Sequence, residues 1–279
     1  MATIGIIGVG LIGGSVASGV RAAALYDEIL GFDAAPAASE HARASGLIDR
    51  AAADIESLAR ESALVLIAVP TRSIGGCLDA LAGSPGVDEL VITDTGSVKG
   101  AVVAAASKAF GGLPPGFVPG HPIAGSEQSG GQAANGTLFH ERKVILTPTP
   151  ATSPESLMQV ETLWQGLGAE VRQMSAQRHD RLLAMTSHLP HMLAYALVDM
   201  LASQPAPEEI FGLAAGGFRD FTRIASSDPQ MWHDIFMDNS EALIHALDLF
   251  EARLHGLRSL IEEHRSEDIL ALCEHAKQA

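Results

Sequence analysis

Apolar residues in the first half of the chain gather in short runs, separated by stretches with helical spacing. Each run is rich in Val, Ile or Leu and too short for a helix, as expected of strands buried on both faces of a parallel sheet. The alternation of such runs with helices predicts a doubly wound α/β sheet. The runs lie at residues 4–7, 29–32, 64–69, 90–93, 117–118 and 144–146.

The pattern changes after a turn-rich segment at residues 147–154. One more helix (157–167) and strand (169–173) follow, and then only helical spacing remains, at residues 176–203, 229–263 and 266–277. We therefore predict a doubly wound, Rossmann-type domain over residues 1–174 and an all-helical domain over residues 175–279. The long apolar stripe at 229–263 needs a covering partner, which favours a homodimer.

Composition narrows the class of protein. The 279 residues carry a formal net charge of -15 and are 47% hydrophobic, so nucleic acid and anionic membrane surfaces are disfavoured as partners. Cys77 and Cys273 are too few for a disulfide framework. A strand-like segment follows Met1 directly, and apolar runs stay below the roughly 18 residues of a membrane span. These features predict a cytoplasmic protein.

A G-x-G-x-x-G pattern follows the first predicted strand and opens a helix. It comprises Gly8, Gly10 and Gly13, with Leu11 and Ile12 between them. Glycines there permit a tight turn and close approach of the backbone to a pyrophosphate, while the helix N-terminus stabilises the phosphate charge. The alternative is an ordinary tight turn with a capping Asp, and the strand–turn–helix context favours the dinucleotide site.

The second predicted strand ends at Asp33. An acid at this place accepts hydrogen bonds from a ribose 2′-hydroxyl and repels a 2′-phosphate, so the expected cofactor is NAD rather than NADP. Val69, Pro70 and Thr71 close a later strand, where open α/β sheets line their nucleotide crevice.

Four segments carry candidate chemistry. Residues 93–99 (TDTGSVK) and 120–127 (GHPIAGSE) follow predicted strands, on the crevice side of such a sheet. Residues 187–191 (SHLPH) place two histidines one helical turn apart, and residues 217–224 (GFRDFTRI) carry two arginines four residues apart. A neutral imidazole accepts protons near neutral pH, and Arg binds carboxylates in a bidentate manner.

These strings, in this order, resemble the prephenate dehydrogenase family, over nearly the whole chain. The resemblance implies oxidative decarboxylation of prephenate to 4-hydroxyphenylpyruvate with NAD, in tyrosine biosynthesis. It is shared by arogenate and cyclohexadienyl dehydrogenases, so the choice between prephenate and arogenate stays open. So does the question of whether tyrosine, which resembles the product, competes at the substrate site.

The resemblance also implies roles for individual residues. His121 matches the catalytic histidine that accepts the substrate hydroxyl proton, and Ser97 matches the serine beside it. Residues matching substrate contacts are Arg223, His188, His191, Ser126 and Arg219. Arg219 departs from some members of the family, which have a Lys or another residue at this position.

Simpler interpretations stand beside these roles. Ser97 could cap the helix that follows it, and His121, His188 and His191 could be structural. No metal is expected, because the His-x-x-His pair lacks nearby Cys or acid ligands. A β-hydroxyacid dehydrogenase would need a lysine in the helical domain, where only Lys277 occurs. A non-catalytic NAD sensor on the same fold remains a rival of another class.

Overall fold

The computed structural model describes residues 2–124 and 130–278 and divides the chain into two compact units. The first unit contains the residues up to 182 together with 226–239. The second contains residues 183–225 and those from 240 onward. Residues 226–239 therefore pack with the N-terminal unit, although segments of the second unit flank them in sequence.

A six-stranded parallel sheet in the order β3-β2-β1-β4-β5-β6 forms the centre of the first unit. Its central strands consist of the predicted apolar runs and are almost completely buried. β3 has no apolar run, because both of its residues are exposed. The strands are β1 (Thr3–Ile7), β2 (Glu28–Phe32), β3 (Arg50–Ala51), β4 (Leu64–Ile67), β5 (Val91–Asp94) and β6 (Phe117–Val118).

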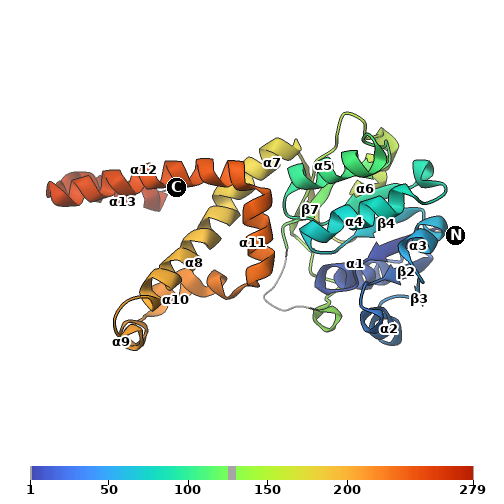
Figure 1. Ribbon diagram of the computed structural model, residues 1–279, viewed down its shortest axis with the longest axis horizontal. Helices are drawn as coiled ribbons and strands as arrows, with labels where there is room; N and C mark the ends of the chain where they lie inside the picture. Colours follow the sequence, from blue (N-terminus) through green and yellow to red (C-terminus); the bar gives the residue numbers. More distant parts are fainter. Residues whose placement is uncertain (1, 125–129, 279) are drawn as a thin grey trace. The chain divides into compact units, whose positions relative to one another are not determined.

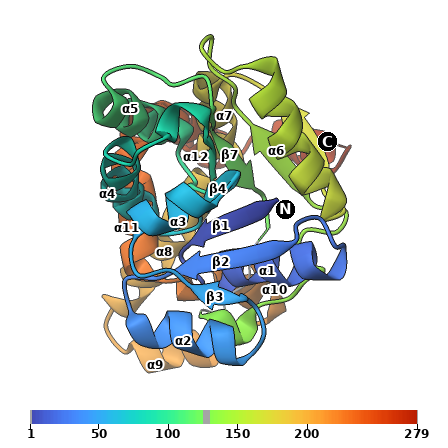
Figure 2. The ribbon, with the colours of Figure 1, turned by 90° about the vertical axis from the view of Figure 1, so that its right-hand side faces the viewer.

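Helices cover both faces of this sheet (Figure 2). α1, α2 and α6 pack on one face, and the indole of Trp164 in α6 is fully buried there. α3, α4 and α5 pack on the other face. This arrangement confirms the predicted fold class for the N-terminal part. The helices are α1 (Leu11–Ala22), α2 (Pro36–Ala44), α3 (Ile55–Glu61), α4 (Thr71–Ala82), α5 (Lys99–Phe110) and α6 (Pro154–Gly166).

A second, three-stranded sheet in the order β7-β8-β9 extends the first unit. It comprises β7 (Gly120–Pro122), β8 (Lys143–Leu146) and β9 (Glu170–Gln173), with β8 antiparallel to β7. The predicted strand at 144–146 therefore does not belong to the doubly wound sheet. The β5–β6 ladder ends at Thr93 and Val118, and beyond it the Gly120 N–H donates to the side-chain carboxylate of Asp94 at 3.1 Å, while the Pro119 carbonyl accepts from the Thr147 N–H after β8.

Two further helices, α7 (Ala176–Leu183) and α11 (Pro229–Asp238), belong largely to the first unit. The sequence predicts one continuous helix over 229–263, and this is wrong. α11 ends at Asn239, whose backbone leaves the helical conformation and whose side-chain amide donates a hydrogen bond to the Asp180 carbonyl at 2.9 Å. A new helix then begins at Ser240.

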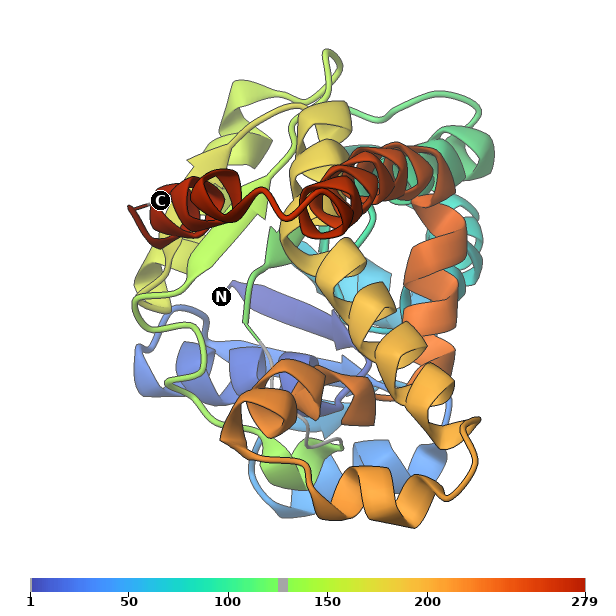
Figure 3. The same ribbon diagram turned by 90° about the vertical axis from the view of Figure 1, so that its left-hand side faces the viewer.

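The second unit is helical, as predicted. It begins with a π-helical turn at Ala184–His188, because Pro190 has no N–H to continue the α-helical pattern and the Leu189 N–H bonds to the Ala184 carbonyl instead. α10 and α9 pack against α8 (Figure 3), and α13 folds back beside α12 (Figure 1). Its helices are α8 (Leu189–Ala202), α9 (Pro207–Gly212), α10 (Gly216–Thr222), α12 (Ser240–Glu262) and α13 (Ser266–Gln278).

Three short 3-10 helices complete the secondary structure of the described residues, at Val87–Glu89, Gly131–Ala133 and Arg223–Ser226. Within the described part of the chain, the helices all fall short of the length and apolarity needed to cross a membrane.

Candidate active site

The glycine-rich turn joins β1 to α1 and leaves room for a phosphate group. Gly8 has a φ of +90°, and a Cβ there would lie 2.4 Å from the Ala68 carbonyl oxygen. A Cβ on Gly13 would lie 1.9 Å from the Gly8 carbonyl oxygen. A Cβ on Gly10, by contrast, would meet no described atom within 4 Å. The turn is therefore tight where the backbone packs and open where a pyrophosphate would approach, beside the half-buried Leu11 and Ile12 of the first turn of α1.

Asp33, at the end of β2, is held over this turn by backbone hydrogen bonds. Its Oδ2 accepts from the Val9 N–H at 3.1 Å, and its Oδ1 accepts from the Ala35 N–H at 2.9 Å. The Asp33 N–H in turn donates to the Ser39 hydroxyl at 2.9 Å. The carboxylate is half-buried, so it can accept further hydrogen bonds from a ribose.

The carboxyl end of β4 leads into α4 through Val69 and Pro70, and α4 begins at Thr71. The Thr71 hydroxyl accepts a long hydrogen bond from the Ser97 N–H at 3.4 Å. The structure thus brings together a residue predicted for the cofactor site and one predicted for catalysis. Both side chains are half-buried.

Ser97 is not the cap of the next helix. α5 begins at Lys99 with Val98 as its N-cap residue, and Val98 has no hydrogen-bonding side chain. The first two N–H groups of α5 donate instead to the Asp180 carboxylate, from Lys99 at 2.9 Å and from Gly100 at 2.8 Å. The start of α5 is therefore capped by Asp180, which is distant in sequence, and not by Ser97.

A buried ion pair holds the backbone just before His121. The side chains of Lys99 and Asp94 are both completely buried and contact each other, and the Lys99 ammonium also donates to the Gly120 carbonyl. Asp94 accepts from the Gly120 N–H at 3.1 Å and from the Gly96 N–H at 2.8 Å. Burial lowers the pKa of Lys99, while the Asp94 carboxylate acts in the opposite direction.

His121 lies on β7 and is half-buried. Its Nδ1 lies 2.8 Å from Nε2 of His179, on α7, and the two rings meet edge to face with centroids 5.1 Å apart. His179 is fully buried, and its Nδ1 lies 2.7 Å from Oδ1 of Asp180. Sequence reasoning gave His179 no role, because 58 residues separate it from His121. An imidazole next to an acid in sequence was the only available signal.

The predicted substrate-binding residues of the second unit lie on α8, α10 and the adjoining turns. His188 ends the π-helical turn and is buried, whereas His191 is half-buried and donates from Nδ1 to the Ser187 carbonyl at 2.9 Å. Burial lowers the pKa of His191, and the nearby Arg223 guanidinium lowers it further, against the effect of the Ser187 hydrogen bond. Arg223 and Arg219 are exposed.

The hydrophobic neighbours of these arginines are less packed than the sequence suggested, since Phe221 is 45% exposed. Ser126, the remaining predicted substrate contact, lies outside the described residues.

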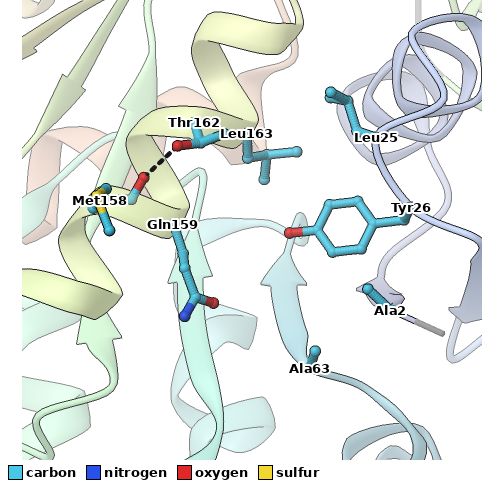
Figure 4. Close-up of a pocket in the computed structure, with 8 residues that line it drawn as sticks. All are labelled: Ala2, Leu25, Tyr26, Ala63, Met158, Gln159, Thr162 and Leu163. Atoms are coloured by element: carbon cyan, nitrogen blue, oxygen red, sulfur yellow. Dashed lines mark hydrogen bonds between the residues drawn. The ribbon is translucent and has the colours of Figure 1, made fainter.

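A hollow of about 340 Å³ lies elsewhere on the first unit (Figure 4). It is lined by Ala2 and Ala63, which precede β1 and β4, and by Tyr26 and side chains of α6 such as Met158. It is therefore at the amino ends of the strands, whereas the glycine turn, Thr71 and Ser97 follow carboxyl ends. Its lining is mostly aliphatic, so it offers little chemistry for catalysis.

Two family models together match most of the chain. Residues 16–173 match the nucleotide-binding domain of prephenate dehydrogenase, and residues 175–277 match the dimerization domain of prephenate dehydrogenase.

Individual relatives are similar over almost the whole length. Cyclohexadienyl dehydrogenase from Zymomonas mobilis is 39% identical over 99% of this chain and 93% of its own length. Prephenate dehydrogenase from Bacillus subtilis is 37% identical over 99% of this chain and 74% of its own length. The crystal structure of prephenate dehydrogenase from Aquifex aeolicus, in complex with hydroxyphenyl propionate and NAD+, matches with a TM-score of 0.93 at 37% identity and covers 99% of this chain and 96% of that one.

Proposed function

The chain belongs to the prephenate dehydrogenase family, and on this basis we propose that it catalyses the NAD-dependent oxidative decarboxylation of prephenate to 4-hydroxyphenylpyruvate. The observation that carries the proposal is the arrangement of His121. This imidazole follows the strands of a dinucleotide-binding sheet, and its ring and its backbone are both held by buried polar groups. A histidine fixed so firmly is suited to proton transfer.

The cofactor is NAD, and the residues present fit it. The space beside Gly10 and the N-terminus of α1 accommodate a pyrophosphate, and Asp33 accepts hydrogen bonds from the adenosine ribose. When bound, NAD would supply the acceptor for the hydride that leaves the ring carbon bearing the substrate hydroxyl. The negative charge of Asp33 opposes binding of a 2′-phosphate, and Ala34, Ala35 and Pro36 supply no cation to offset it.

His121 is the proton acceptor in the proposed reaction. Its ring accepts the hydrogen bond of the substrate 4-hydroxyl and takes up that proton as the hydride leaves and the C–O bond gains carbonyl character. The bond from the ring to the departing carboxylate then breaks, and its electron pair aromatises the ring. The proton returns to the phenol oxygen of the product, so the net reaction releases none. Ser97 assists by hydrogen bonding beside the same hydroxyl.

The substrate carboxylates need cationic partners, because the protein as a whole is strongly acidic. We assign Arg223 to one of them, with His188, His191 and Ser126 as further contacts and Arg219 in support. The lowered pKa of His191 favours its neutral form. A neutral His191 that donates from Nδ1 to Ser187 retains a lone pair on Nε2, which can accept a hydrogen bond.

A homodimer in the cytoplasm is the proposed working form. The match of residues 175–277 to a dimerization domain supports it, together with the exposed apolar residues Ile244, Leu254 and Ile261 on α12, which are 58%, 48% and 61% exposed. The chain has two cysteines, Cys77 and Cys273, which are too few for a disulfide framework and fit a reducing compartment. Tyrosine shares the phenol ring of the product and would compete for the same site.

Arogenate is the second candidate substrate, because a cyclohexadienyl dehydrogenase is among the full-length relatives. The experiment is a spectrophotometric assay of NADH formation with prephenate and arogenate in parallel, using the wild-type chain, His121→Asn and Arg223→Gln. His41→Asn, at an exposed position of α2, is the matched control for the histidine.

We expect turnover with prephenate and a loss of about 10²- to 10⁴-fold for His121→Asn at unchanged NAD affinity. Arg223→Gln should raise the KM for prephenate by roughly 10- to 100-fold, as the loss of a charged hydrogen bond predicts. Protein that binds NAD but turns over neither substrate would reject the proposed function and favour the sensor.

A further inference from the structure

Two buried residues beyond the proposed machinery support the His121 imidazole, one by direct contact and the other through the first. His179 is fully buried, and its Nε2 faces Nδ1 of His121 at 2.8 Å. On its other side, His179 Nδ1 faces Oδ1 of Asp180 at 2.7 Å. The three groups form a hydrogen-bonded series that runs from the Asp180 carboxylate through the His179 imidazole to the His121 imidazole. All three lie within the first compact unit.

Asp180 is held as a carboxylate by several donors. Its oxygens accept the first two N–H groups of α5, from Lys99 and Gly100, as well as the contact from His179. Burial would raise the pKa of Asp180, but these hydrogen bonds outweigh it and the pKa is lowered. Gly100 makes the approach feasible, because a Cβ at that position would lie 2.9 Å from Asp180 Oδ2.

The proton positions along this hydrogen-bonded series follow from one another. An ionised Asp180 only accepts hydrogen bonds, so the Nδ1 of His179 must carry its proton. A neutral His179 then has a lone pair on Nε2 and accepts from His121, whose proton must lie on Nδ1. The lone pair of His121 is thereby placed on Nε2. This tautomer is the one that a proton acceptor needs if Nε2 faces the substrate.

We propose that His179 and Asp180 are positioning residues that fix His121 in the Nδ1–H tautomer and orient its Nε2 as the proton acceptor. The proposal rests on the proposed role of His121. It also gives the carboxylate a part in the reaction: as His121 gains a proton and a positive charge, the hydrogen bond to His179 strengthens, and Asp180 stabilises the charge through it. Asp180 itself gains no proton. The same logic holds for the buried aspartate of a serine-protease triad.

Asp180→Asn is the test variant, since it changes the proton pattern with almost no change of shape. Asp180 Oδ1 contacts both the Lys99 N–H and His179 Nδ1, whereas Oδ2 accepts from the Gly100 N–H. With the amide oxygen of Asn retained on the Gly100 N–H, its NH₂ group takes the place of Oδ1, donates to His179 Nδ1 and gives up the hydrogen bond from Lys99. His179 would then switch its proton to Nε2 and donate to His121, which would hold its own proton on Nε2. That is the wrong tautomer for accepting a proton.

We expect Asp180→Asn to lower kcat by at least about 100-fold with less than a roughly 3-fold change in KM and in NAD affinity. Asp79→Asn, an exposed acid on α4 of the same unit, is the matched control and should keep wild-type kcat. A folded Asp180→Asn protein with wild-type kcat would overturn the proposal. So would a loss confined to KM, which a merely structural role could produce.

A second measurement does not depend on turnover or on any variant of His179 or Asp180. Histidine-selective ¹⁵N labelling reports the tautomer of each imidazole, and the His121 signals are identified by their loss in His121→Asn. The expected wild-type result is a neutral His121 protonated on Nδ1, and the Nε2–H tautomer would overturn the proposal. Because this readout needs no substrate, absence of turnover with the expected tautomer would reject only the proposed function.

Discussion

The buried Lys99–Asp94 pair makes a sharp prediction about stability. Both side chains are completely buried and lie in the first unit, away from bulk solvent. Lys99→Met keeps most of the aliphatic stem but removes the ammonium. Asp94 would then retain hydrogen bonds from two N–H groups, of Gly96 and Gly120, and would lack an opposite charge. An ionised carboxylate without its cation is unfavourable in such a place.

The expected cost is about 3–5 kcal/mol, as for other buried pairs broken on one side. For a domain of this size, such a loss lowers the thermal midpoint by roughly 6–20 °C. Urea unfolding followed by circular dichroism measures it. Lys108→Met, an exposed lysine on the same helix, is the control and should change the free energy of unfolding by less than about 0.5 kcal/mol.

The double variant Asp94→Asn, Lys99→Met separates charge from packing. It removes both charges at nearly constant volume, so it should be more stable than Lys99→Met alone. If Lys99→Met unfolds like the Lys108→Met control, the pair contributes little and the reasoning about an uncompensated carboxylate is refuted. If the double variant is less stable than the single one, lost packing rather than charge explains the effect.

Two further predictions concern the acids of the first unit. Asp33→Asn keeps an oxygen for the Val9 N–H but removes the charge that opposes a 2′-phosphate. The ratio of kcat/KM for NAD over NADP should therefore fall by about 10-fold or more. An unchanged ratio would show that Asp33 does not select the cofactor. The lowered pKa of Asp180 means that its ionised form stabilises the fold above the unfolded pKa, near 4, and that this contribution is lost as pH falls through the lower folded value. The stability difference between wild type and Asp180→Asn in urea should therefore shrink between about pH 5 and pH 2, and a difference independent of pH would contradict it.

The main sheet could be predicted from the sequence because its strands are continuous apolar runs. β1 and β4 are completely buried, and burial on both faces leaves a strong compositional signal. β3 and β7 left none: β3 is two exposed residues, and β7 is Gly120–Pro122, which is defined by its pairing with β8 rather than by its own composition. The break at Asn239 was missed for a similar reason, since helical periodicity continues through it.

In the candidate site, too, some residues have a local sequence signal and others do not. Gly8, Asp33 and His121 could be proposed from the sequence because each follows a strand in a motif that is local in sequence. His179 and Asp180 could not, because their importance lies in contacts with residues 58 and 80 or more positions away. Local sequence motifs indicate candidate ligand-binding groups, whereas the groups that hold them in place are brought into contact only by tertiary packing.

The first turn of α5 shows why so many polar groups are buried near His121. The Lys99 ammonium donates to the Gly120 carbonyl and so holds the backbone just before His121. The Lys99 N–H donates to Asp180, which contacts His179. His179 in turn contacts the His121 ring. One residue thus belongs to both supports of the imidazole. Replacing a buried ion pair by well-packed apolar residues is often neutral or stabilising, because burying charge is costly. The charged groups fit the proposed role of His121, because a proton acceptor has to be fixed in both position and tautomer, and apolar contacts can provide only the first.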